Sequence, residues 1–248
     1  MTIDEAAAWE ILQRATADLL TIDTASVLAV YAIGSLGGGY YRPGQSDIDA
    51  IFLTLDGSTH IWGNYKNPSQ RLSELNQRYH AMHGIGIDVG SVLASKLFLP
   101  YDPAHISVQG IARLKVQGRR VYGSYDLDSV PMPTIEDVLC DAQRYETWWR
   151  DEYEPAHPIE QMPDMECVSS MLNHLKRFLW IKRGIVEFDK RKMVELYLAN
   201  DPPFIDVMAL RLAQASLAGQ ALTATELEHL RLWAAQLRPQ MNAELGIQ

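Results

Sequence analysis

Two short apolar runs separated by a glycine-rich segment constrain the fold more than any other feature of this sequence. Residues 26–33 form a continuous, partly β-branched run that ends on glycine, and residues 47–54 form a second run, so both are predicted to be strands. A third strand is predicted over 85–93, where glycines indicate a bulge or a close backbone approach, and a fourth over 120–122. Helices are predicted over 5–20, 69–82 and 105–117. The first half of the chain is therefore predicted to mix strands and helices.

The character of the sequence changes after Pro131. From there on, helical patterns cover the segments 134–153, 166–183, 190–200, 203–217 and 223–242. Thr134 and Thr223 stand where a hydroxyl can cap the first amides of a helix, and acids follow each of them. We predict an α+β fold, in which a domain with a mixed sheet covers 1–130 and an all-α helical bundle covers 131–248.

The composition narrows the class of protein. Apolar residues make up 47% and charged residues 21%, close to the globular average, which argues against disordered, collagen-like and coiled-coil chains. The formal charge of -9 argues against binding through nucleic-acid phosphates and favours a neutral or cationic substrate. No apolar run approaches the roughly 20 residues of a membrane span, and acids stand at the N-terminus where a secretory signal carries positive charge. With 2 cysteines, both predicted to be buried thiols, the sequence predicts a cytoplasmic protein.

The segment from Gly34 to Ser46 joins the first two predicted strands and leads directly into an Asp-x-Asp pair, Asp47 and Asp49. Because side chains alternate faces along a strand, both carboxylates project from one face, close enough to share a divalent cation. Magnesium prefers hard oxygen ligands and usually combines a few carboxylates with substrate phosphates. Glycines before the pair let backbone amides approach a triphosphate, and Ser35 adds a hydroxyl donor. The segment therefore predicts a magnesium-dependent nucleotide site.

A second Asp-x-Asp pair, Asp126 and Asp128, follows Gly123-Ser124 almost immediately. It has no glycine-rich segment before it, and serine and prolines follow it instead of an apolar strand. Nothing rigid is predicted to hold these carboxylates, and a binding site needs rigid support. We interpret the second pair as a capped surface turn.

Asp88 stands isolated among the apolar residues of the third predicted strand. Placed beside the first pair, it would complete a metal site or act as general base toward an acceptor hydroxyl. The alternative is an aspartate at a strand edge whose carboxylate is satisfied by water. The neighbouring motif favours the functional interpretation.

One combination of residues resembles the polymerase-beta-like nucleotidyltransferase superfamily: Gly34-Ser35, Ser46-Asp47-Ile48-Asp49 and the later strand acid Asp88. The resemblance implies that Asp47 and Asp49 hold two magnesium ions. It also implies that Ser35 and Ser46 steady the phosphates of a nucleoside triphosphate.

The second half is similar to the helical domain of aminoglycoside (3'')(9) adenylyltransferases, through the segment 175–184 and the lysine beyond it. The resemblance implies that Arg177 and Lys190 contact ATP phosphates; the alternative is a solvated basic face, since Lys and Arg are mostly exposed. The chain departs from that family in having Asp88 where those enzymes carry glutamate. The stretch between Asp88 and the strand at 120–122 is also shorter, which leaves the identity of the acceptor open.

The resemblance implies that an acceptor hydroxyl attacks the α-phosphorus of ATP in line and that pyrophosphate leaves. The ions on Asp47 and Asp49 would stabilise the attacking and leaving oxygens, with Asp88 as metal ligand or base. The acceptor would be a small hydroxylated molecule, either an aminoglycoside-type antibiotic or another compound, neutral or cationic. Two alternatives stay open: a transferase that modifies a protein or an RNA end, and a catalytically silent binding module such as an antitoxin or regulator.

Overall fold

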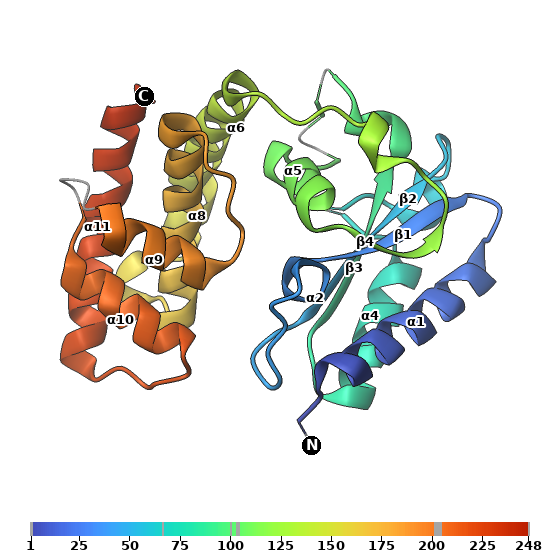
Figure 1. Ribbon diagram of the computed structural model, residues 1–248, viewed down its shortest axis with the longest axis horizontal. Helices are drawn as coiled ribbons and strands as arrows, with labels where there is room; N and C mark the ends of the chain where they lie inside the picture. Colours follow the sequence, from blue (N-terminus) through green and yellow to red (C-terminus); the bar gives the residue numbers. More distant parts are fainter. Residues whose placement is uncertain (1, 66, 100, 103–104, 201–204, 248) are drawn as a thin grey trace. The chain divides into compact units, whose positions relative to one another are not determined.

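The computed structural model describes residues 2–65, 67–99, 101–102, 105–200 and 205–247. The chain divides into two compact units, Met1–Pro133 and Thr134–Gln248. The first combines a sheet with helices, drawn in blue to green in Figure 1, and the second is helical. The predicted fold class is therefore confirmed.

The sheet of the first unit has the strand order β3-β2-β1-β4. Its strands are β1 (Val27–Ile33), β2 (Ile48–Thr54), β3 (Ile87–Leu93) and β4 (Arg119–Gly123). β1 pairs antiparallel with both β2 and β4, whereas β2 and β3 run parallel. A parallel pair requires a crossover, and the helix between β2 and β3 supplies it. As a result the N-terminal ends of β2 and β3 lie side by side.

Helices cover both faces of this sheet. On one face, α1 (Glu5–Ile22) and α4 (Gln70–His83) share a core with Phe52 of β2. On the other face, α5 (Val108–Gln117) shares a core with Ile51. Figure 1 shows α1 and α4 on one side of the strands and α5 on the other. Alternate residues of β2 therefore point to different helices, as the strand period requires.

Short elements complete the first unit: α2 (Gly34–Gly38), α3 (Thr59–Trp62) and two 3-10 helices, Ala94–Leu97 and Leu127–Ser129. The glycine-rich segment after β1 therefore begins as a helical turn rather than as a loop. The predicted helix over 105–117 begins later, at Val108, where the Ser107 side chain accepts from the Gly110 N–H.

The second unit is built around α8 (Asp164–Arg183), which contacts four other helices and is buried along most of its middle. Its neighbours are α6 (Ile135–Trp148), α9 (Lys190–Asn200), α10 (Val207–Leu217) and α11 (Ala224–Leu245). Shorter elements join α6 to α8: a π-helix over Trp149–Tyr153, α7 (Glu154–Ala156) and a 3-10 helix over Ile159–Gln161. Among the described residues, no helix is long and apolar enough to cross a membrane.

The helix starts predicted at two threonines are confirmed. Thr134 and Thr223 each form a capping box, in which the hydroxyl accepts from a backbone N–H and an acid three residues later bonds back. The predicted helix over 134–153 changes to a π-helix at Trp149. The predicted helix over 203–217 begins at Val207, and residues 203 and 204 lie outside the described part of the chain.

The two cysteines differ in burial. Cys167 is buried on α8, as predicted, but Cys140 on α6 is exposed, so that prediction was wrong. The buried stripe of α6 includes Val138, Asp141 and Ala142, and Cys140 lies outside it.

Candidate active site

Asp49 and Asp88 face each other across the parallel strand pair. In the register of β2 and β3, Asp49 is the partner of Asp88, and Ile51 is the partner of Gly90. Neighbouring strands lie about 4.8 Å apart, and paired residues project to the same side of a sheet. Both carboxylates therefore lie on the face that Ile51 shares with α5. The connection through α4 sets the register of β2 against β3. It thereby brings together Asp49 and Asp88, which are distant in sequence.

Asp47 joins the pair just before β2 begins. The Ile48 N–H donates to the Gly86 carbonyl oxygen (2.9 Å), which ties the start of β2 to the residue before β3. A Cβ atom on Gly86 would lie 2.3 Å from Asp47 Oδ1, a distance that real Cβ atoms do not reach. The Asp47 carboxylate therefore rests directly on the Gly86 backbone.

Gly34 makes the equivalent space for Asp49. It follows β1 with φ at +63°, in the left-handed region that favours glycine. A Cβ atom on Gly34 would also lie 2.2 Å from Asp49 Oδ2. Each carboxylate of the first pair thus lies against a glycine, which limits where the side chain can move.

The carboxylates lie near enough to interact electrostatically. Desolvation raises the pKa of Asp88, and the Asp47 carboxylate raises it further. The Asp88 side chain as a whole is exposed, so nearby protein atoms crowd the carboxyl group without enclosing it. Like charges held together in this way favour uptake of a proton or a cation.

Ser35 and Ser46 lie at opposite ends of the connection between β1 and β2. Ser35 belongs to α2, and its carbonyl oxygen accepts from the Tyr40 N–H (3.0 Å). Ser46 Oγ accepts from the Arg42 N–H (3.0 Å), so this hydroxyl closes a turn before Asp47. Both hydroxyls keep a proton that could be donated to a ligand. Their contacts with phosphates stay predictions.

The residues fit a magnesium ion that takes some of its ligands from a substrate. In the described part of the chain, no group of three or more His, Cys, Asp or Glu side chains is arranged to hold a metal ion. Magnesium usually needs only one or two carboxylates, because phosphate oxygens and water complete its octahedron. Asp47 and Asp49 meet that requirement. Asp88 as a third ligand, and the binding of two ions, stay predictions.

Tyr65, which the sequence interpretation missed, lies on the same face of the sheet as Asp49 and Asp88. The Tyr65 ring lies on Gly90 of β3, where a Cβ atom would come within 2.4 Å of the ring. Burial raises the pKa of Tyr65 to about 12, and the Asp88 and Asp49 carboxylates contribute to the shift. Arg113, on α5, acts in the opposite direction. A glycine inside a strand was the available signal, but it does not reveal which side chain approaches.

The second Asp-x-Asp pair forms the capped surface turn predicted for it. Asp126 Oδ1 accepts from the Asp128 N–H (2.9 Å), and the Ser129 hydroxyl donates to the Asp126 carbonyl oxygen (2.7 Å). Both aspartates are exposed. The Asp126 carboxylate therefore caps a backbone N–H of its own turn.

One solved structure resembles this chain over nearly its whole length. The spectinomycin adenyltransferase AAD(9) from Enterococcus faecialis, solved with ATP and spectinomycin, matches with a TM-score of 0.69. The match covers 94% of this chain and 99% of that chain. This chain has a nucleotidyltransferase fold. The sequence identity is 15%, which establishes the fold alone.

Other comparisons add little to this fold. A toxin-antitoxin structure with AMP-PNP and a toxin-antitoxin MntA-HpeT mutant match with TM-scores of 0.33 and 0.32, at 16% and 15% identity. Each covers 58% of this chain and 93% of its own, and similarity at this level supports no further statement. No family model matches the sequence, and no curated protein matches it.

The two basic residues predicted to contact ATP lie in the second unit. Arg177 on α8 is 7% exposed, and its guanidinium carbon lies 3.7 Å from the centre of the Tyr145 ring. Lys190 begins α9, and its Nζ donates to the Ser169 hydroxyl (2.8 Å). The burial of Arg177 excludes the solvated basic face as an explanation for it. The contacts of both residues with ATP phosphates stay predictions.

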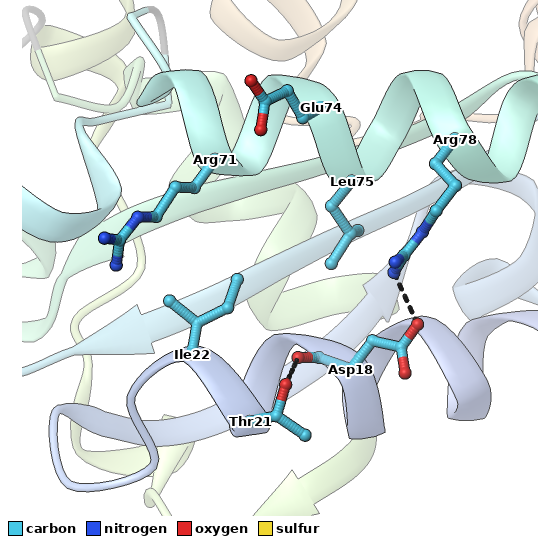
Figure 2. A pocket seen from close by; sticks show the side chains of 7 residues that line it. All are labelled: Asp18, Thr21, Ile22, Arg71, Glu74, Leu75 and Arg78. Carbon is cyan, nitrogen blue, oxygen red and sulfur yellow. Dashed lines mark hydrogen bonds and ion pairs between the residues drawn. The ribbon is translucent and has the colours of Figure 1, made fainter.

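A cavity of about 620 Å³ lies between α1 and α4. Figure 2 shows its lining, in which Arg78 of α4 points to Asp18 of α1 and pairs with it at 2.5 Å. The Tyr79 hydroxyl also donates to this carboxylate (2.9 Å). These two helices cover the face of the sheet opposite Asp49, so the cavity is separate from Asp49 and Asp88.

Proposed function

We propose that this chain transfers the AMP group of ATP to a hydroxyl of a small acceptor and releases pyrophosphate. The observation that carries the proposal is the meeting of Asp47, Asp49 and Asp88 at the start of the β2–β3 pair. Carboxylates held on a rigid sheet are what a metal-assisted phosphoryl transfer requires. The adenyltransferase fold supports the same reaction class.

Asp88 is the proposed general base. In the reaction the acceptor oxygen bonds to the α-phosphorus, the bond from that phosphorus to the bridging oxygen breaks, and pyrophosphate leaves. The acceptor proton passes to the Asp88 carboxylate. A base works best when its pKa lies near the working pH, and the raised pKa of Asp88 moves this carboxyl in that direction.

Asp47 and Asp49 would hold magnesium together with oxygens of the triphosphate. The bound ion supplies Lewis-acid activation of the phosphoryl group and neutralises the charge of the leaving oxygen. Because each carboxylate lies against a glycine backbone, its position is set before the substrate arrives. Ser35 and Ser46 would donate their hydroxyl protons to the phosphates.

The proposed acceptor is small, hydroxylated and neutral or cationic. The net charge of -9 attracts cationic acceptors over long range, whereas the charge of ATP would be balanced locally by magnesium. The structure with the similar fold contains spectinomycin, so aminoglycoside-type and related hydroxylated antibiotics are the first acceptors to test.

The test combines labelled ATP, magnesium and a panel of such acceptors. We expect the α-phosphate label to enter an acceptor and unlabelled acceptor to disappear in equal amount. Calorimetry with ATP, with and without magnesium, gives a second measurement. Absence of magnesium-dependent ATP binding would overturn the proposal and favour a catalytically silent binding module.

A further inference from the structure

The strand that carries Asp88 lies at one edge of the sheet. The strand order β3-β2-β1-β4 gives β3 a strand neighbour on one side, which is β2. The outer side of an edge strand presents backbone N–H and C=O groups that no strand pairs with, so its conformation is less constrained than that of a central strand. A catalytic group, however, must be held to within about 0.5 Å of its productive position. A base on β3 therefore requires support from outside the sheet.

The side chain of Asn76 gives this support. Its amide oxygen accepts from the Val89 N–H (3.2 Å), and its amide nitrogen donates to the Val89 carbonyl oxygen (3.3 Å). One side chain thus satisfies both backbone groups of Val89, as a further strand would. Asn76 lies in the middle of α4, the helix that connects β2 to β3. The helix that sets the register of β3 therefore also bonds to its backbone.

The residue that Asn76 holds is the one that follows Asp88. Val89 is 3% exposed, and its side chain belongs to the core that α1 and α4 share with the sheet. Asp88 projects to the opposite face, because side chains alternate along a strand, and Asp49 of β2 is its partner there. The segment is thus fixed by the ladder with β2, by the Val89 side chain and by the Asn76 amide. The direction of the Asp88 side chain follows from this backbone.

We propose that Asn76 is a positioning residue for Asp88: by pairing with Val89, it fixes the β3 backbone from which the Asp88 carboxylate reaches the acceptor hydroxyl. The inference rests on the proposed function, which assigns Asp88 the role of base. Asn76 contributes no group to the reaction, since it acts through the backbone of the neighbouring residue.

Asn76→Leu tests the inference, because it removes both hydrogen bonds and keeps a side chain of similar size. We expect kcat to fall about 10- to 100-fold, since a misplacement of roughly 1 Å caused far from the chemistry can cost about 100-fold. The KM for ATP should stay constant, because the proposed ATP site depends on Asp47 and Asp49 at the start of β2. A purely structural role would lower the stability without separating kcat from KM in this way.

Ser91→Ala is the matched control on the same strand. Ser91 is 1% exposed, and its hydroxyl donates to the Trp62 carbonyl oxygen (3.4 Å), so this variant also releases β3 from a neighbouring segment. Urea denaturation should show a loss of stability in both variants, whereas Ser91→Ala should keep the wild-type kcat. An equal fall of kcat in the two variants would overturn the inference, as would a wild-type kcat in Asn76→Leu.

A measurement without turnover separates this inference from the proposed function. 15N relaxation gives the order parameter of the Asp88 backbone N–H. We expect about 0.85, the value of rigid backbone, in wild type and in Ser91→Ala, and a fall toward about 0.6 in Asn76→Leu. Equal order parameters would overturn the role of Asn76. A fall in Asn76→Leu, in a protein whose wild type transfers no label, would support the hold of Asn76 on this backbone and overturn the proposed function.

Hydrogen exchange in the wild-type protein tests the same contact if Asn76→Leu does not fold. The Val89 N–H should exchange as slowly as the amides that β3 bonds to β2, because the Asn76 oxygen accepts from it. Rapid exchange of this amide in the folded wild type would overturn the inference.

Discussion

The chain contains the same Gly-Ser and Asp-x-Asp elements twice, and the two copies have different structures. The first pair lies at the start of β2, next to a parallel strand that brings Asp88 to Asp49. The second pair lies in a 3-10 turn, where Asp126 caps the Asp128 N–H. The difference comes from neighbours, because a carboxylate acquires chemistry only when other elements hold it beside a second charged group.

The second turn is nevertheless well anchored. Lys115 of α5 donates through Nζ to the carbonyl oxygens of Leu127 (2.8 Å) and Val130. Rigidity is therefore not what separates the copies. The first pair has a third carboxylate and two closely packed glycines beside it, whereas the Asp126 carboxylate accepts from a backbone N–H of its own turn.

Removing the charges from each copy should give the largest contrast. Asp47→Asn with Asp49→Asn should lower transfer activity by about 10³-fold or more, because metal and electrostatic stabilisation of the transition state is lost. Asp126→Asn with Asp128→Asn should stay within about 2-fold of wild type, since exposed substitutions have small effects. Initial rates with saturating ATP measure both. Equal losses in the two double variants would contradict the assignment of the site.

Gly86→Ala should disrupt the first Asp-x-Asp pair without replacing either carboxylate. The new methyl group displaces Asp47, so manganese binding followed by electron paramagnetic resonance, and activity, should weaken by about 10- to 100-fold. In an Asp47→Asn background, where the ion is already lost, the same substitution should cause little further loss. A full additional loss in the double variant would show that Gly86 acts through something other than Asp47.

Lys115→Met should affect the second copy alone. Two carbonyl oxygens lose a charged donor, so the free energy of unfolding should fall by roughly 1–3 kcal/mol. Urea denaturation measures this change. Activity at a temperature where the variant is folded should equal that of wild type, and a large loss there would mean that the turn contributes to the site.

Among the changes in stability, Asp88→Asn should give the smallest, a gain in the free energy of unfolding below about 1 kcal/mol, because the side chain is exposed. The pKa of Asp88 is raised in the folded state, so the folded protein binds this proton more tightly than the unfolded chain does. Stability therefore falls as the pH rises from the ordinary value of 3.8 through the folded pKa.

Thermal unfolding at pH 7 and at pH 3 checks the direction of this pH dependence of stability. The Asp88→Asn variant should be the more stable protein at pH 7, and the gain should vanish at pH 3, where both forms are neutral. Asp126→Asn is the matched control on the exposed turn and should show no such gain. A gain that persists at pH 3 would contradict electrostatic crowding around Asp88.

Much of the fold was predictable because it depends on local patterns. The apolar runs predicted four strands, and the hydroxyls of Thr134 and Thr223 marked helix starts that the structure confirms. The helical turn at Gly34–Gly38 and the π-helix at Trp149–Tyr153 were missed, since neither has a strong local signal. The burial of Arg177 could not be predicted from the sequence either, because it depends on which helices surround α8.

For the candidate site, the sequence by itself predicted that Asp47 and Asp49 project to one side, because side chains alternate along an extended chain. In the structure β2 begins at Ile48, so Asp47 lies just before the strand. Only the tertiary structure decided that Asp88 lies opposite Asp49 and that Tyr65 lies on Gly90. The register of parallel strands is set by the crossover helix and the core it packs on, not by the residues that meet. Contacts with other elements of the tertiary structure likewise distinguish the first Asp-x-Asp pair from the second.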